Sequence, residues 1–343
     1  MTKILVHTSP RGFRIEEPLM NAGYSVVKIP DNQHKSLKLL NLMRVIAQEN
    51  PRIILVDSAG LMLISAFFLS KLFRIPLIVR MRADIWVIYR EQKEYNNLFI
   101  RVYEWVLLIS CEAILRRAAR IFSVSEYLKG VMKEKGIQAE KIRVMPFPID
   151  CTRFHPEKKE DHNITLLSVA NLTFKRKTEG LLEILPVIHE VISKHQNIRY
   201  LIAGGGRFSE LLKESLLTLK NEHIVYLGFQ NEIENLFSRA DIFIHYSYLD
   251  AYPSVVLEAM ASGLPVIANR FGGMTEQVES ETGALVEDTH AFRRALEQLI
   301  ENKDMRVAMG KKGRSNVSER FSMNRIKECY AGEIDEILTN KYV

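Results

Sequence analysis

The chain is poor in cysteine. Its 343 residues include three, Cys111, Cys151 and Cys329, which are scattered and odd in number. This pattern argues against a disulfide framework and favours a reducing compartment. No C-x-x-C pair and no Cys/His cluster is present, so the sequence predicts no metal site.

Long apolar runs are also missing. No segment stays apolar for the ~20 residues that a membrane-spanning helix requires. The nearest candidate, residues 53–72, is interrupted by Asp57 and is better interpreted as a strand, Ile53–Val56, followed by a buried helix, Leu61–Phe73. Lys3–His7 is typical of a first strand and is too short for a signal peptide. We therefore expect a cytoplasmic protein, and peripheral attachment to the inner face of the cell membrane stays open.

Charge is unevenly distributed along the chain. Residues 1–150 hold 23 Lys and Arg against 14 Asp and Glu, a net charge of +9, and residues 151–343 have a net charge of −3. A basic first half favours an anionic partner such as a lipid diphosphate or an anionic membrane surface, although a solvated charged face gives the same balance. No RNA- or DNA-binding motif accompanies the charge, so we expect no nucleic-acid partner.

The segment Leu98–Arg120 combines apolar residues with a basic cluster at Arg116, Arg117 and Arg120. Such a helix could face a membrane. A buried helix with a basic C-terminal end, which its dipole favours, explains the same residues.

Short apolar runs alternate with longer amphipathic segments along the whole chain. Buried strands separated by helices predict an α/β fold with two doubly wound parallel sheets. The two-proline turn Pro146–Asp150 and the charged segment Pro156–Asp161 predict a boundary between domains at residues 1–150 and 151–323. The strands are expected near Lys3–His7, Ser25–Ile29, Ile53–Val56, Pro76–Arg80, Ile121–Val124, Arg143–Pro146, Ile164–Ala170, Arg199–Ala203, Ile224–Leu227, Ile242–His245, Pro265–Ala268 and Ala284–Val286.

The stretch from Asp250 to Gly273 carries the most chemistry. It predicts a turn, a short helix, a strand and a Gly-Gly loop. The free N–H groups and the dipole at the start of a helix favour a phosphate. Two carboxylates flanking such a site suit the hydroxyls of a sugar diphosphate. The expected binding residues here are Asp250, Tyr252, Pro253, Ser254, Val255 and Glu258.

This stretch resembles the E-x7-E region of family 4 glycosyltransferases. The chain has Asp250-x7-Glu258, with Asp where the family usually has Glu, followed by the EAMA-x-G-x-PV run and the Gly-Gly pair. The resemblance covers nearly all of residues 120–290 and, more loosely, the first domain. It implies a GT-B fold, in which two Rossmann-like domains face a central cleft and the second holds most of the nucleotide sugar. It also implies that the last helix, about residues 324–343, packs back on the first domain.

Three cations, Lys175, Arg176 and Lys177, follow an expected strand. Preorganised cations at the carboxyl end of a strand can neutralise a leaving diphosphate in the transition state. Similar enzymes usually carry an Arg just after this strand and a Lys about six residues later, and here Asn171 and Lys177 hold these positions. We expect a basic loop in which Lys177 is catalytic and Arg176 binds the donor, although a solvated turn is the alternative.

Two further positions of the second domain follow the family's order. Gly204 and Gly205 stand at its G-x-G turn, where glycine permits close approach of the backbone to a ligand. Phe229 follows the next expected strand. We assign all three residues to donor binding.

In the first domain, Arg11, Gly12 and Arg14 stand where similar enzymes carry a glycine loop that faces the diphosphate and the acceptor. A basic surface turn is the alternative. Arg82 stands about where many family members have a His. Because Arg stays protonated, it cannot serve as a base, but it could orient a hydroxyl, bind an acidic acceptor or pair with Asp84. We assign Arg82 to the catalytic set and Asp84 to the acceptor loop.

The resemblance implies a glycosyltransferase of the hexosyltransferase type that acts in glycan biosynthesis at the cell envelope. It would move a sugar from a nucleotide-diphosphate sugar to a glycan or lipid-linked acceptor with retention at the anomeric carbon and without a metal or another cofactor. Two alternatives stay open. One is a GT-B nucleotide-sugar 2-epimerase, and the other is a catalytically silent relative that binds nucleotide sugars or glycans, suggested by Asp250, Asn171 and Arg82.

Overall fold

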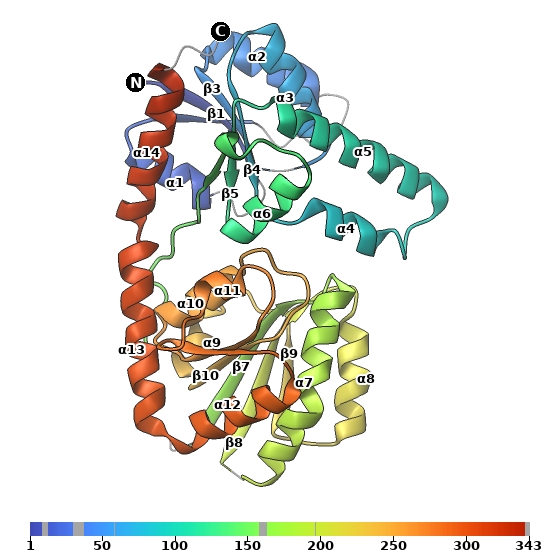
Figure 1. Cartoon of the computed structure of the whole chain (residues 1–343), viewed down its shortest axis with the longest axis vertical. Helices are drawn as coiled ribbons and strands as arrows, with labels where there is room; N and C mark the ends of the chain where they lie inside the picture. The colour runs from blue at the N-terminus through green and yellow to red at the C-terminus, as the bar shows by residue number, and fades with distance from the viewer. Residues whose placement is uncertain (9–12, 30–37, 58, 158–162, 196, 340–343) are drawn as a thin grey trace. The chain divides into compact units, whose positions relative to one another are not determined.

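The computed structural model describes residues 1–8, 13–29, 38–57, 59–157, 163–195 and 197–339. They form two compact units (Figure 1). Unit 1 comprises Met1–Pro148 and Met323–Val343, and unit 2 comprises Ile149–Ser322. Each unit contains one six-stranded parallel sheet flanked by helices. This confirms the predicted α/β fold with two doubly wound sheets.

The sheet of unit 1 has the order β2-β1-β3-β4-β5-β6. Its central strands are buried along their whole length, as is typical of parallel strands covered by helices on both faces. The strands are β1 (Lys3–His7), β2 (Ser25–Lys28), β3 (Ile53–Val56), β4 (Leu77–Met81), β5 (Arg120–Ser123) and β6 (Ile142–Val144). The helices are α1 (Phe13–Asn21), α2 (Lys38–Glu49), α3 (Leu61–Leu72), α4 (Ile85–Gln92), α5 (Leu98–Arg117), α6 (Glu126–Glu134) and α14 (Met323–Thr339), with a 3₁₀ turn at Ala139–Lys141.

The last helix belongs to the core of unit 1. Tyr330 of α14 packs edge-on against Phe122 of β5, with ring centroids 5.5 Å apart. Tyr24 donates a hydrogen bond to the Asp335 carboxylate at 2.7 Å, and Arg120 forms an ion pair with Glu336 at 2.6 Å. Apolar packing and charge pairing together hold α14 against this sheet, beside α1 (Figure 1).

The sheet of unit 2 has the order β12-β11-β10-β7-β8-β9. Its first strand in sequence therefore lies in the middle, and the strand order reverses between β10 and β7. The strands are β7 (Ile164–Asn171), β8 (Ile198–Gly205), β9 (Ile224–Gly228), β10 (Ile242–His245), β11 (Val266–Asn269) and β12 (Gly283–Val286). The helices are α7 (Lys175–Ser193), α8 (Ser209–Leu219), α9 (Glu234–Arg239), α10 (Ser254–Ala261), α11 (Met274–Gln277), α12 (Thr289–Glu301) and α13 (Lys303–Arg320).

The expected strand bounds differ from those of the structure by two residues or fewer at each end. Within the described ranges, no helix combines the length and the apolar character needed to cross a membrane.

Candidate active site

Ligands of open α/β sheets bind at the carboxyl ends of the strands, where the strand order reverses. In unit 2 this point lies between β7 and β10. The chain leaves β7 toward the start of α7 and leaves β10 toward the start of α10. The two helix starts that carry most of the predicted donor-binding residues therefore follow neighbouring strands.

Asp250 lies at the centre of a polar network after β10. Its Oδ1 accepts a hydrogen bond from Lys177 Nζ at 2.5 Å, and its Oδ2 accepts one from Ser247 Oγ at 2.7 Å. His245 Nε2 lies 3.1 Å from the same Oδ2. Burial alone would raise the pKa of the Asp250 carboxyl, but Lys177 and His245 together lower that pKa well below its usual range. The carboxylate stays ionised and holds the Lys177 ammonium beside it.

The three predicted cations do not form a loop, and this part of the prediction is wrong. Lys175, Arg176 and Lys177 are the first three residues of α7, which follows Phe174 directly. Asn171 explains the early start, because its Oδ1 accepts the Thr173 N–H at 3.0 Å and closes the turn that leads into the helix. Cations in a first turn oppose the helix dipole, so a bound anion at this end would relieve an unfavourable arrangement.

The start of α10 is packed against the Gly272-Gly273 loop that follows β11. The N–H of Gly273 donates to the Asp250 carbonyl at 3.3 Å. A Cβ at Gly273 would lie 2.0 Å from the Ala251 carbonyl oxygen, so only glycine fits there. Pro253 precedes Ser254 and Val255, which begin α10, and its side chain supplies no cap to the helix. The close approach of the Gly273 backbone to Asp250 and Ala251 thus positions the loop that leads from Asp250 into α10.

Glu258 lies inside α10, in its second turn, and is 2% exposed. Tyr252 is also buried, and burial raises the pKa of its phenol above the usual value. Burying an ionised carboxylate costs folding free energy unless a cation or a hydrogen-bond donor pairs with it. Arg153, whose pKa is raised chiefly by Glu234, also interacts with the Glu258 charge.

Gly204 and Gly205, predicted at a turn, are the last two residues of β8 and lie beside Phe229, which follows β9. Gly204 has a φ of +148°, and a Cβ there would lie 1.9 Å from the Ala170 carbonyl oxygen. A Cβ at Gly205 would lie 3.2 Å from Phe229 Cβ, so the two predicted residues are neighbours. The Phe229 side chain is 73% exposed. An exposed aromatic ring at the carboxyl end of a sheet suits stacking of a planar ligand group.

The remaining predicted residues belong to unit 1. Arg82 Nε and Arg80 Nη1 form ion pairs with Asp57 Oδ1, at 2.9 and 3.6 Å. Asp84 caps α4, because its Oδ1 accepts the N–H groups of Trp86 and Val87. Asp84 therefore has a structural role in this unit, and its predicted role in the acceptor loop stays a prediction.

Asp57 and Arg80 are both almost fully buried, at 1% and 2% exposure. Burial raises the pKa of the Asp57 carboxyl despite the two arginines, which lower it. Both residues line a cavity of about 370 Å³ whose other walls are largely apolar, with Ile85, Ile88 and Leu107 among them. Unit 1 therefore offers an apolar cavity with a charged end.

The predicted glycine loop after β1 falls largely outside the described residues. Arg11 and Gly12 are not described. Arg14 lies in α1.

Two family profiles match the chain. The profile described as Glycosyltransferase Family 4 matches residues 3–153, and the one described as Glycosyl transferases group 1 matches residues 151–316. The chain belongs to the family 4 glycosyltransferases. The predicted resemblance is confirmed.

Curated glycosyltransferases align with much of this enzyme at low identity. The capsular polysaccharide biosynthesis glycosyltransferase CapM of Staphylococcus aureus is 26% identical over 204 residues, which are 58% of this chain and 52% of the relative. An Escherichia coli enzyme named UDP-Gal:alpha-D-GlcNAc-diphosphoundecaprenol alpha-1,3-galactosyltransferase is 26% identical over 67% of this chain and 63% of its own. The chain therefore spans about half the length of several curated relatives, and as little as 43% of one of them.

Solved structures support the GT-B fold of this glycosyltransferase. Anabaena Alr3699/HepE, solved in complex with UDP, has a TM-score of 0.77 and 17% identity, over 98% of this chain and 100% of its own. Sucrose-phosphate synthase of Thermosynechococcus elongatus has a TM-score of 0.82 and 17% identity, over 99% and 100%. At this identity the likeness shows the fold alone.

Sequence reasoning missed three partners in the network of this glycosyltransferase. His245 and Ser247 contact the Asp250 carboxylate, and Asn269 bonds the Ser247 backbone through both ends of its amide, at 2.9 and 3.0 Å. The signal for His245 was its place at the end of a strand, five residues before the acid, but a lone strand-end His is common as a structural residue.

Proposed function

We propose that this enzyme transfers a sugar from a nucleotide-diphosphate sugar to a glycan or lipid-linked acceptor, with retention at the anomeric carbon. The observation that supports it best is the Lys177–Asp250 pair, which lies where the strand order of unit 2 reverses. A fixed ammonium at this place suits a leaving diphosphate. Negative charge builds up on the diphosphate as the glycosidic bond breaks, so the ammonium stabilises the transition state more than the bound donor.

The proposed donor contacts follow from the chemistry of each group. The backbone N–H groups of Ser254 and Val255, at the start of α10, bind phosphate oxygens. Glu258 accepts hydrogen bonds from ribose hydroxyls, and Phe229 stacks on the base. Lys177 meets the departing diphosphate, with Arg176 beside it in the first turn of α7.

Asp250 has two parts in this proposal. It is the first acid of the family motif and is expected near the donor sugar. In the described network it also orients Lys177 and neutralises its charge. A donor phosphate that approached Lys177 would compete with Asp250 for the ammonium, so donor binding would rearrange this pair.

The names of the relatives support a nucleotide-sugar donor and leave its identity open. Anabaena HepE was solved with UDP-glucose, and the Escherichia coli galactosyltransferase is named for UDP-Gal and a diphosphoundecaprenol acceptor. The cavity of unit 1, with an apolar wall and a charged end at Arg80 and Arg82, suits an acceptor that has both polar and apolar parts.

A panel assay tests the proposal. The enzyme is incubated with UDP-, GDP- and ADP-sugars, with and without lipid-linked acceptors, and release of the nucleotide diphosphate and the anomeric configuration of the product are measured. We expect one donor class to turn over faster with an acceptor. Donor binding without turnover under any condition would favour the catalytically silent relative, and an inverted product would overturn the proposed retention.

A further inference from the structure

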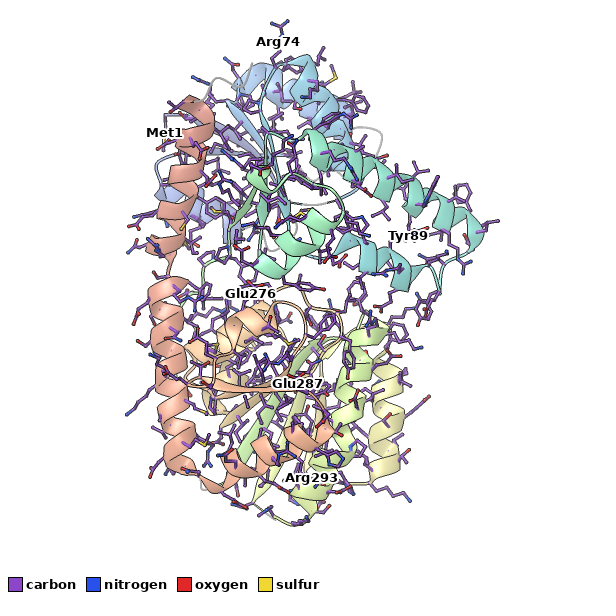
Figure 2. The ribbon with its side chains drawn as sticks, viewed as in Figure 1. Met1, Arg74, Tyr89, Glu276, Glu287 and Arg293 are labelled. Carbon is purple, nitrogen blue, oxygen red and sulfur yellow. The ribbon has the colours of Figure 1, made fainter. Side chains whose placement is uncertain are left out.

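The long helix α5 of unit 1 has two different faces. Its inner face packs against α3 and α4 and supplies Leu107, Leu108 and Cys111 to the wall of the cavity. In Figure 1, α5 extends away from the sheet of unit 1 with α4 beside it. Tyr89 of α4 is labelled on this projection in Figure 2 and also lines the cavity.

The outer face of α5 is unusual because it carries no polar uncharged residue and no acid among its exposed positions. Ten residues of the helix are exposed, eight of them apolar or aromatic and two of them arginines. A solvent-facing helix normally presents polar and charged residues on this side. Six of the exposed apolar residues recur at helical spacing, and we call them the α5 outer face. They are Leu98, Phe99, Val102, Trp105, Val106 and Ile109.

The spacing makes this face one continuous strip. Leu98, Val102, Trp105 and Ile109 are separated by four, three and four residues, so they lie along one side of the helix. Phe99 and Val106, seven residues apart, lie next to this row. Phe99 is 83% exposed and Trp105 is 52% exposed, so large aromatic side chains face outward at two levels of the helix.

Basic residues continue the strip toward the C-terminal end of α5. Arg116 and Arg117 are exposed and fall on the same side as Leu98 and Phe99, five turns further on. Neither acid of the helix is exposed: Glu104 accepts a hydrogen bond from Asn96, and Glu112 pairs with Arg116, which leaves Arg117 as the exposed arginine without an acid of α5 beside it. Unit 1 as a whole holds 26 Lys and Arg against 17 Asp and Glu, whereas unit 2 holds 21 against 24.

We propose that the α5 outer face docks on the surface of an anionic lipid bilayer, lying in the interface with Phe99, Trp105 and their neighbours among the acyl chains. Large apolar and aromatic residues on one face, with arginines at one end, are the composition of interfacial helices. The charge of unit 1 complements anionic headgroups and adds an attraction that salt screens. This goes beyond sugar transfer, because the surface faces away from the cavity and does not require a particular donor or acceptor.

A second copy of the chain is the competing occupant. Arg116 is already paired with Glu112 of its own helix. A dimer through this face would bring Arg117 of each copy onto an interface that offers no exposed acid of α5 to pair with it. An anionic bilayer supplies that negative charge, so Arg117 favours lipid over a second copy.

Trp105 provides a direct probe. Vesicles of phosphatidylglycerol and of phosphatidylcholine are titrated into the 343-residue chain, and tryptophan emission and co-sedimentation are measured. Trp86, the only other tryptophan, is 6% exposed and packs inside unit 1, so a change in emission reports Trp105. We expect a blue shift and sedimentation with phosphatidylglycerol, weaker at high salt, and little of either with phosphatidylcholine.

Two variants with matched exposure decide the surface. Phe99→Asp places a charge on the outer face, and we expect it to weaken vesicle binding at least tenfold. Leu217→Asp changes an apolar side chain of similar exposure on α8 in unit 2, 75% against 83% for Phe99, and this variant should bind as the wild type does. Far-UV circular dichroism checks that both fold, and Arg117→Gln should reduce the preference for phosphatidylglycerol without abolishing binding.

The proposal fails in three ways. Absence of vesicle binding by the wild type would overturn it, as would unchanged binding by Phe99→Asp. A concentration-dependent dimer that Phe99→Asp dissociates, seen by light scattering without vesicles, would assign the face to a second copy. None of these outcomes bears on release of nucleotide diphosphate with a water-soluble acceptor, so the proposed sugar transfer is tested independently by the panel assay.

Discussion

The two units place charged residues at the carboxyl edges of similar sheets in opposite electrostatic states. In unit 2 the central acid, Asp250, is held by three partners at 2.5–3.1 Å, and its pKa is lowered. In unit 1 the central acid, Asp57, is held by two arginines at 2.9 and 3.6 Å, and its pKa is raised. Burial by itself raises both pKa values, so the number and closeness of the polar contacts decide the direction of each shift.

The strand orders account for part of this difference. Counting strands from the start of each unit, unit 2 has the order 3-2-1-4-5-6 of a Rossmann sheet, and unit 1 has 2-1-3-4-5-6. The reversal in unit 2 brings together the segments that follow its first and fourth strands, so Lys177 in the first turn of α7 meets Asp250 in the loop after β10. In unit 1 the corresponding charges come from the third and fourth strands, which are simple neighbours. Unit 2 therefore presents a cation beside a helix start, and unit 1 encloses its charges at the end of an apolar cavity.

The largest effect should come from Lys177→Ala. If unit 2 stabilises a leaving diphosphate, removal of this ammonium should lower kcat by about 10²–10³-fold and change KM less. Lys175→Ala is the matched control, because Lys175 lies in the same turn and forms an exposed pair with Glu179. Steady-state kinetics decide it. If kcat falls equally in both variants, the general positive charge of the first turn of α7 explains the effect, and Lys177 is not the residue that stabilises the leaving diphosphate.

The next effect concerns stability and sharpens the contrast between the two acids. Asp250→Asn leaves Lys177 without its counter-ion and should lower the free energy of unfolding by roughly 3 kcal/mol at pH 7. Asp57→Asn should cost less, because burial of the Asp57 charge outweighs the attraction of its arginines. Urea unfolding of both variants at pH 7 measures the difference.

The pH dependence of that difference has a definite sign. A lowered pKa in the folded state stabilises the fold above the unfolded pKa of about 3.9, so the cost of Asp250→Asn should shrink as the pH falls below about 4. A raised pKa acts in the opposite direction, because ionisation of Asp57 opposes folding as the pH rises above the unfolded value. A larger cost for Asp57→Asn than for Asp250→Asn at pH 7 would reverse the comparison.

A smaller effect is expected from Glu258→Ala. The loss of a charged hydrogen bond to a ribose hydroxyl is worth roughly 1.5–3 kcal/mol, which is about 10- to 100-fold in donor affinity. Calorimetric binding of the donor measures it, and Glu279→Ala, an exposed acid in the same unit, is the control. Unchanged donor affinity in a folded Glu258→Ala variant would remove Glu258 from the site.

The fold was predictable because buried parallel strands appear in the sequence as short apolar runs. Ile53–Val56 is an example, and it ends where polar residues begin. The turn and the helix of the Asp250–Glu258 stretch could also be predicted, because the motif is contiguous in the sequence. The network was not, because Lys177 and Asp250 are 73 residues apart and meet only through the strand order. Asp57 was missed for a related reason: it lies after an apolar strand and meets Arg80 and Arg82 only through strand pairing.

The start of α7 shows a different limit. Three consecutive cations give no hydrophobic period, so Lys175–Lys177 was interpreted as a loop. The signal for a helix start was the Asn171 side chain, which closes the preceding turn through Thr173. Such a bond within a turn depends on the backbone geometry at the end of β7, which the sequence does not specify.

The smallest effect tests whether nucleotide binding belongs to unit 2 alone. Phe229→Ala removes an exposed ring beside Gly205 and should weaken nucleotide diphosphate binding by about 1 kcal/mol, or about fivefold, as loss of a stacking partner does. Tyr89→Ala removes an aromatic ring from the cavity of unit 1 and should leave nucleotide affinity unchanged. Because the Phe229 ring is largely solvent-exposed, its removal should also leave the melting temperature within about a degree of the wild type. Calorimetric titration of each variant with UDP and GDP gives the two affinities. Equal losses in both variants would show that the nucleotide also depends on unit 1, and the contrast between the units would then no longer separate donor from acceptor.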